Sequence, residues 1–142
     1  MSVTTKRYKV IKLTITDLAA DGMLADGNGK KYFDVSDMDV ERVIMEHNIT
    51  GLTGTNVIFK ALTTSDPNNS GATTDAALVG ADGSTAFVSA TITAAGRGAK
   101  AISLANDGGA NCSNLGTKIG VWADTTSITD LDGELFLVII GK

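Results

Sequence analysis

The chain has 142 residues, of which 16 are acidic and 12 are basic, and its formal net charge is −4. This length suits one domain that buries about two thirds of its unfolded surface. The weak negative charge, with no basic run longer than two residues, excludes the clustered basic footprint of a nucleic-acid-binding protein. A single cysteine, Cys112, and a start without an apolar signal segment predict synthesis in a reducing cytoplasm.

The first residues are too polar to belong to a core, so we expect an N-terminal arm over residues 1–7 and a single domain over 8–142. Short runs rich in β-branched and aromatic residues, several of them alternating between apolar and polar side chains, predict strands along the domain. In chain order they cover residues 8–15, 32–35, 36–49, 57–63, 85–92, 99–104, 118–124 and 135–140. Segments rich in Asp, Asn, Ser and Gly predict the connections. These are 21–22, 26–29, 51–56, 64–83, 106–116 and 130–133.

Residues 36–49 are ambiguous. Ser36 is a suitable cap for a helix with one apolar face. As a strand, the same segment places Val43, Met45, His47 and Ile49 on one face. We favour the strand, because its β-branched residues agree with the surrounding pattern, and we expect a hairpin from it into residues 57–63.

The apolar run near the end of the chain, from Leu135 to Ile140, is too short to cross a bilayer, so no membrane association is expected. As a strand it would be apolar on both faces. About eight strands at irregular spacing, without a convincing helix or repeat, predict an all-β fold: an antiparallel two-sheet β-sandwich, specifically a jelly roll. Such a sandwich covers one face of the terminal strand, so we expect Phe136, Val138 and Ile140 to contact a neighbouring subunit or a folded-back arm rather than water.

His47 is the only histidine, which excludes the multi-histidine metal centre of enzymes resembling cupins. Nothing in the sequence places Cys112 or any one serine beside it for nucleophilic catalysis. No glycine-rich nucleotide-binding motif occurs. We therefore expect no enzymatic activity, no catalytic residue and no cofactor.

Two groups of acidic residues offer oxygen ligands of the kind that Ca²⁺ prefers. They are Asp17, Asp21 and Asp26 in one group, and Asp130, Asp132 and Glu134 in the other. Neither group has the spacing of a defined calcium loop. We expect these aspartates to form turns and no metal to be bound.

Several stretches follow one another in a recognisable order: a strand, a glycine-bearing loop and a second strand, then a glycine-rich hairpin, then a late strand that ends in apolar residues. They are 49–62, 80–84 leading to Phe87, 95–96 before 102–104, 116–121 and the apolar closing strand. In this pattern residues 43–140, roughly two thirds of the chain, resemble the head decoration (cement) proteins of tailed bacteriophages.

The resemblance implies a structural virion protein that associates with itself as a homodimer or homotrimer. Its other partner would be the major capsid protein, on the exterior of an assembled capsid that it stabilises against internal DNA pressure. No catalytic or contact residue is carried over from the family. The residues themselves suggest an interface, made by aromatics expected to be exposed, by the arm and by the free face of the last strand. These candidates are Tyr32, Trp122, Lys6, Arg7, Phe136, Val138 and Ile140.

The alternative is a carbohydrate- or receptor-binding β-sandwich module of a phage tail or baseplate. It is motivated by Trp122, an aromatic able to stack on a sugar ring. The long polar loops at 64–83 and 105–117 also favour it.

Overall fold

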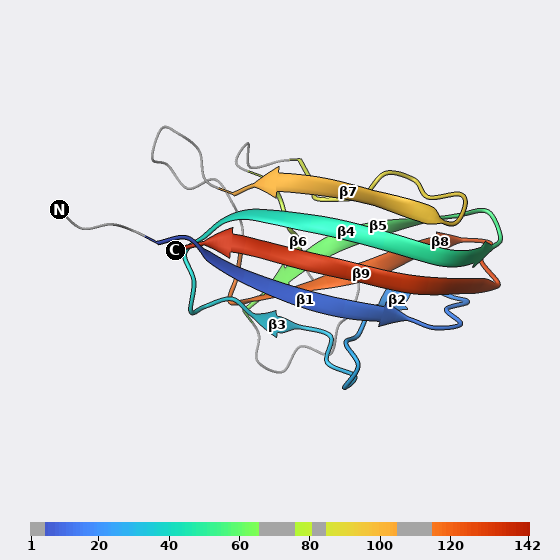
Figure 1. Ribbon diagram of the computed structural model, residues 1–142, viewed down its shortest axis with the longest axis horizontal. Coiled ribbons are helices and arrows are strands. Elements are labelled where there is room, and N and C mark those ends of the chain that lie inside the picture. The colour runs from blue at the N-terminus through green and yellow to red at the C-terminus, as the bar shows by residue number, and fades with distance from the viewer. Residues whose placement is uncertain (1–4, 66–75, 81–84, 105–114) are drawn as a thin grey trace.

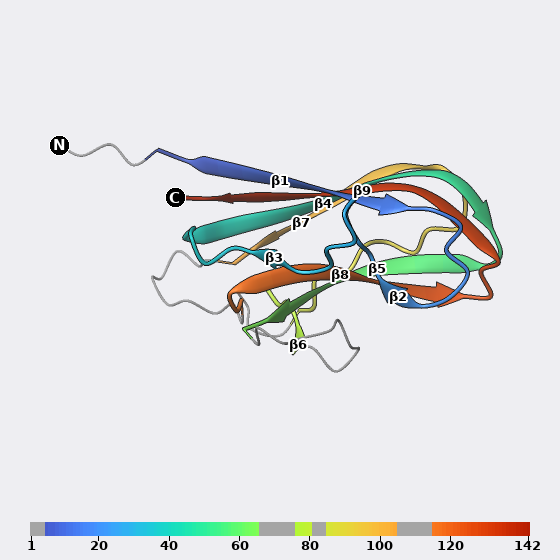
Figure 2. The ribbon, with the colours of Figure 1, turned by 90° about the horizontal axis from the view of Figure 1, so that it is seen from below.

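The computed structural model describes residues 5–65, 76–80, 85–104 and 115–142, and these form two antiparallel sheets without a helix. Figures 1 and 2 show the two sheets as layers packed face to face. Sheet A contains, in spatial order, β1 (Arg7–Ile15), β9 (Asp130–Gly141), β4 (Val40–Thr53) and β7 (Gly96–Ser103). Sheet B contains β2 (Gly22–Met23), β8 (Lys118–Thr126), β5 (Asn56–Thr64) and β6 (Ala76–Ala77), and β3 (Phe33–Asp34) also pairs with β8. The predicted all-β sandwich is confirmed.

The strand pairings are nested from the outside of the sequence inward. The first strand pairs with the last, β2 and β3 pair with β8, β4 pairs with β7, and β5 pairs with β6. This is one long antiparallel hairpin rolled up so that its successive pairs fall alternately in the two sheets, which is the connectivity of a jelly roll. Because β2 and β3 share one partner strand, the nine segments fill eight strand positions.

β9 lies in the middle of sheet A, between β1 and β4 (Figure 1). Its residues Leu135, Leu137 and Ile139 are fully buried, because alternate residues of a strand point to the same face and this face meets sheet B. Leu13 of β1 and Met45 of β4 lie opposite them in register and are buried as well. The core therefore gathers around the terminal strand, as its apolar run predicts.

The strand reading is confirmed for residues 40–49, since β4 runs from Val40 to Thr53, whereas residues 36–39 form a turn before the strand. The expected hairpin into β5 is wrong. β4 pairs with β9 and β7 in sheet A, whereas β5 pairs with β8 in sheet B. Gly54 turns the chain across the end of the sandwich at φ 134, and a side chain there would lie 2.2 Å from the Ser127 carbonyl oxygen. A local sequence signal for a tight connection does not reveal whether the two strands share a sheet.

Other boundaries also differ from the expectations. Gly22 of the expected turn at 21–22 belongs to β2, and residues 51–53 of the expected loop at 51–56 belong to β4. β9 begins at Asp130, so the expected turn over 130–133 is already strand. The turn lies just before it, where Ser127 has φ 50. Residues 85–92 form isolated bridges to β5 and to Val79 instead of a continuous strand. The greater part of the expected loops at 64–83 and 106–116, with Cys112, lies outside the described residues.

Across the described ranges, no helix is long and apolar enough to cross a membrane.

Candidate functional site

The outer face of sheet A, turned toward the viewer in Figure 1, carries an apolar stripe across all four strands. The register aligns the residues of this outer face, apolar and polar, in rows that run from β1 through β9 and β4 to β7. The four rows are Tyr8, Ile140, Arg42 and Ser103; Val10, Val138, Ile44 and Ala101; Lys12, Phe136, Glu46 and Ala99; and Thr14, Glu134, Asn48 and Arg97. We call this surface the sheet A face. The candidates Phe136, Val138 and Ile140 lie at its centre.

The β1 edge of the sheet A face carries exposed large apolar side chains. Tyr8 is 68% exposed and Val10 is 62% exposed, and they are the large apolar residues most open to solvent among those described. Phe136, Val138 and Ile140 are half-buried by their neighbours within the sheet. No described segment of the chain lies over them, so contiguous apolar surface faces solvent, as at surfaces that bind other proteins.

The two ends of the sheet A face differ in charge. At the end where β1 begins and β9 finishes, Glu41 pairs with Lys6 and Lys142, the latter pair at 3.3 Å. Arg42 is exposed there and makes no ion pair within the described part of the chain. The hydrogen bonds to Lys6 and Lys142 lower the pKa of the Glu41 carboxyl.

The opposite end of the face is acidic. Glu134 pairs with Lys12 at 3.4 Å, and Glu46 stands one row above it without an ion pair among the described residues. At the adjoining start of β9, Asp17, Asp130 and Asp132 offer oxygen atoms within 4.8 Å of one another. The pKa of Asp130 is raised by burial and by hydrogen bonding and repulsion from the neighbouring carboxylates.

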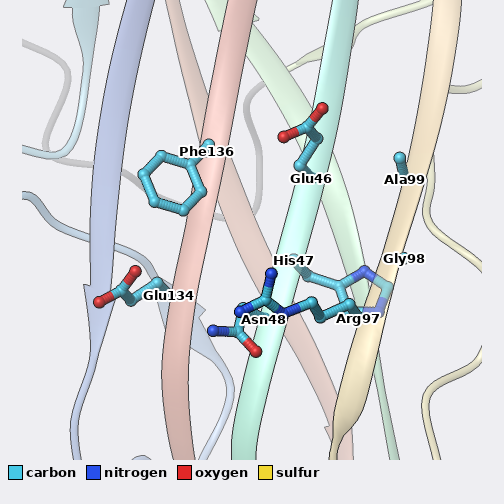
Figure 3. Close-up of a pocket in the computed structure, with 8 residues that line it drawn as sticks. All are labelled: Glu46, His47, Asn48, Arg97, Gly98, Ala99, Glu134 and Phe136. Atoms are coloured by element: carbon cyan, nitrogen blue, oxygen red, sulfur yellow. The ribbon is translucent and has the colours of Figure 1, made fainter.

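A pocket of about 520 Å³ opens at this acidic end (Figure 3). Its lining combines one aromatic ring, two carboxylates, an amide and a guanidinium. The lining residues are Glu46, His47, Asn48, Arg97, Gly98, Ala99, Glu134 and Phe136. Gly98 leaves room for His47, because a side chain at this glycine would lie 2.5 Å from Cε1 of the imidazole.

The charges in the pocket are incompletely compensated. Neither Glu46 nor Arg97 forms an ion pair within the described ranges, and Figure 3 shows them on neighbouring strands, β4 and β7. His47 belongs to the inner face of β4, with its ring centroid 6.3 Å from that of Phe59. Its partial burial lowers the pKa of the imidazole, so the ring is neutral at neutral pH.

The two basic candidates of the arm have partners within the chain. Lys6 pairs with Glu41. Arg7 already belongs to β1 and donates a 2.6 Å hydrogen bond to the carbonyl oxygen of Asp37. The arm expected over 1–7 is therefore tied to the segment before β4 at its last two residues.

The aromatic candidates lie on sheet B, away from the sheet A face. Tyr32 is only 8% exposed, so the expectation that it is an exposed aromatic is wrong. Its ring covers Gly120 of β8, a glycine where a side chain would approach Cδ1 of the tyrosine to 3.1 Å. Trp122 is half-buried and pairs in register with Met23 and Lys60. The structure thus separates these aromatics from the terminal-strand candidates.

The acidic groups expected from the sequence are regrouped by the fold. Asp21 accepts hydrogen bonds from the backbone N–H and the hydroxyl of Thr125, which lower its pKa. Asp26 accepts bonds from N–H groups of its own turn, in the turn-forming role expected of it. Only Asp17, from the first group, joins Asp130 and Asp132.

Sequence reasoning missed Tyr8, Val10 and Ile44 as members of the surface. The alternation in residues 8–15 does place Tyr8 and Val10 opposite the core face. Their relation to Val138 depends on the pairing of β1 with β9, which are more than a hundred residues apart. Only the tertiary structure supplies that relation.

Neither family models nor curated proteins give a match to this chain. One solved structure that resembles it is a chain from the Bacillus endospore appendages, described as a novel family of disulfide-linked pili. The two chains have a TM-score of 0.47 and 10% sequence identity, over 99% of this chain and 91% of the other. A likeness at this level carries no argument about function.

Proposed function

We propose that this protein is a structural, non-enzymatic subunit of a larger protein assembly, and that the assembly is the capsid of a tailed bacteriophage. The observation that carries the first part is the sheet A face, where Tyr8 and Val10 are largely exposed beside Phe136, Val138 and Ile140. Exposing this much contiguous apolar surface is unfavourable in water, and contact with protein removes it. The resemblance to head decoration proteins supports the second part.

In this function the protein binds the exterior of the assembled, expanded capsid through contacts with the major capsid protein. The stabilisation is a consequence of mass action. A ligand that binds only the assembled shell lowers its free energy by RT ln(1 + [L]/Kd) per site, about 2.7 kcal/mol when the free concentration is a hundred times Kd. Many occupied sites add up to a large resistance of the expanded shell to the internal pressure of packaged DNA, with no chemical step.

The test is co-sedimentation of the purified protein with expanded capsids and with unexpanded procapsids of the phage that encodes it. We expect saturable binding to expanded capsids and greater resistance of the loaded particles to heat. Mass spectrometry of purified virions should detect the chain in a fixed ratio to the major capsid protein. Absence from virions together with no binding to capsids would refute the proposal.

The pocket favours a second candidate, a carbohydrate-binding module. Phe136 presents an aromatic ring next to the carboxylate of Glu46, the amide of Asn48 and the guanidinium of Arg97. Such a lining fits a sugar, whose C–H face stacks on the ring while its hydroxyls bond to the polar groups, and about 520 Å³ is the volume of a small-ligand site. A glycan array tests it, with Phe136→Ala as the loss-of-binding variant. Trp122→Ala serves as the matched variant on the other sheet, and silence of the native protein on the array would remove this candidate.

A further inference from the structure

We propose that the sheet A face is covered by a second copy of this chain, packed face to face about a two-fold axis that runs along the row Val10, Val138, Ile44. This inference deepens the proposed function, on which it rests for the idea that the chain is an assembly subunit. It names one partner of the surface, the orientation of that partner and the residues that meet.

The first argument is the geometry of the rows. A two-fold axis along the central row leaves that row facing itself, so Val138 packs on Val138 and Ile44 on Ile44 of the second copy. Each strand then lies over its own counterpart with the direction reversed, and the rows on either side of the axis exchange. Aligned sheets pack in this way about 10 Å apart, with an angle of about 30° from their twist.

Residues that face each other after this exchange are complementary on three of the four strands, β1, β9 and β4. On β1, Tyr8 of one copy faces Lys12 of the other, so the ammonium group can lie over the aromatic ring. Ile140 faces Phe136 across β9, apolar against apolar. A contact of this kind satisfies the requirement of a two-fold interface, in which each residue pair occurs twice by symmetry.

On β4, the exchange places Arg42 opposite Glu46 of the second copy. Both side chains are exposed, and neither forms an ion pair within the described residues of its own chain. Glu46 borders the pocket, so the guanidinium of the incoming Arg42 enters a hollow whose lining holds two carboxylates, those of Glu46 and Glu134, against the one guanidinium of Arg97. Arg binds carboxylates through two parallel hydrogen bonds, so this pair would fix the register between the two copies.

The charge difference between the ends selects the reversed orientation. At one end Arg42, Lys6 and Lys142 outnumber their acidic neighbour Glu41. This end comes to lie over the other, where Glu46, Glu134 and the cluster around Asp132 outnumber the cations Lys12 and Arg97. A face-to-face pair with parallel strands would place each of these ends over its own kind and lose this attraction.

The size of the face sets the expected strength. Four strands about 4.8 Å apart, with same-face residues about 6.8 Å apart along each, give a projected area of roughly 500 Å². This is below the ~800 Å² per partner of a standard interface. We therefore expect a dimer with a micromolar dissociation constant for the protein in solution, one that becomes fully populated where copies are concentrated on an assembly.

The main experiment is sedimentation equilibrium of the full chain over a concentration series that reaches the high micromolar range. We expect a monomer–dimer equilibrium for the native protein. Val138→Asp should raise the dissociation constant at least about tenfold, because it buries two charges against each other, while its circular dichroism spectrum and melting temperature stay near native. Asp124→Lys, on the exposed side of β8 in sheet B, is a larger charge change on the opposite sheet and should leave the equilibrium unaltered.

A charge exchange tests the register itself. Arg42→Glu and Glu46→Arg should each weaken the dimer, because each brings like charges together, and the double variant should restore it. Both positions are exposed on one strand, so folding is not at risk. Failure of the double variant to recover, with both single variants folded and weakened, would overturn the proposed register.

Cross-linking tests the orientation. In a Cys112→Ser background, a mixture of Lys6→Cys and Thr14→Cys proteins should form mixed dimers with a short thiol-specific cross-linker. Each variant alone should cross-link poorly, because the reversed strands separate identical positions at the ends. Efficient cross-linking of either variant alone would contradict the reversed arrangement.

The outcomes separate this inference from the proposed function. A chain that is strictly monomeric at all concentrations but binds expanded capsids refutes the dimer and leaves the function standing. A dimer broken by Val138→Asp that binds no capsid and is absent from virions supports the inference and refutes the function.

Discussion

The outer faces of both sheets carry apolar side chains, but those of sheet B are covered by other parts of the chain and, among the described residues, those of sheet A are not. On sheet B, Leu62 and Tyr32 are buried outside the main core, and the segment before β3 folds back over Gly120 of β8, where Lys31 and the ring of Tyr32 lie close to the glycine. On sheet A, Val138 and Ile140 stand beside Tyr8 and Val10 with no described segment above them. The comparison teaches that a strand with apolar residues on both faces can have its outer face covered by another segment of its own chain or left exposed.

The two tyrosines provide the largest expected contrast. Tyr32→Ala should lower the free energy of unfolding by about 3 kcal/mol, since it removes a buried ring and leaves a cavity over β8. Tyr8→Ala should change the free energy of unfolding of the monomer by less than about 0.5 kcal/mol, because this ring is 68% exposed. Urea denaturation at low protein concentration measures both. Equal losses for the two variants would contradict the difference between the faces.

Gly120 of β8 tests the same covering of sheet B by the segment before β3, with a smaller expected loss of stability. In Gly120→Ala, the added methyl group would lie 2.7 Å from the Lys31 carbonyl oxygen and 2.6 Å from Cε of Met23. We expect a loss of about 1–3 kcal/mol as the backbone shifts to relieve this overlap. Gly27→Ala, with no atom within 4 Å of the added group, is the control and should melt near the native temperature.

The inner face of sheet A should respond to pH through His47. Its folded pKa lies below the ordinary value of 6.5 because burial penalises the charged ring, so the unfolded chain binds more protons between these two values. Stability is therefore complete above about pH 6.5 and falls as the pH drops below it. His47→Gln should remove this dependence between pH 7.5 and 5.5 in denaturant titrations. A native slope that persists in the variant would assign it to another group.

The acidic end of the sheet A face should give the smallest effect. The folded pKa of Asp130 is raised, so the folded chain holds its proton more strongly, and ionisation at neutral pH disfavours folding. Asp130→Asn should slightly raise the melting temperature at pH 7. The advantage should disappear well below pH 3.8, the ordinary value of this carboxyl, where the native side chain is protonated in both states. A variant that melts lower at pH 7 would show that the carboxylate is stabilising.

Local periodicity predicts the strands and the inner residues well, because burial on one side of a sheet imposes a period of two. Ile11, Leu13 and Ile15, and likewise Ile119, Val121 and Ala123, are buried as the alternation predicts. The preference for a strand after Ser36 is correct for the same reason. Tyr32 was misassigned because exposure on the outer side of a sheet depends on which other segment crosses it, and that crossing is remote in sequence.

The connections between strands also depend on contacts that are remote in sequence. The glycine-bearing loop at 51–56 has the composition of a hairpin turn, yet Gly54 carries the chain from one sheet to the other. Turn chemistry specifies the local φ, as at this glycine, but the choice of partner strand belongs to long-range pairing. The candidate acidic groups were divided by sequence proximity, whereas the fold brings Asp17 to Asp130 and Asp132.

The sequence by itself determined that the terminal strand has two apolar faces and that a two-sheet sandwich covers one of them, because alternation within a single strand contains that information. The pairing with β1 and β4 decided that the face left is the one with Phe136, Val138 and Ile140. The tertiary structure alone decided that Tyr8 and Val10 extend this face, that Arg42 and Glu46 flank its central row, and that the two ends carry different charges. These relations arise from the register between strands distant in sequence, which is selected by the packing of the whole core rather than by any local pattern.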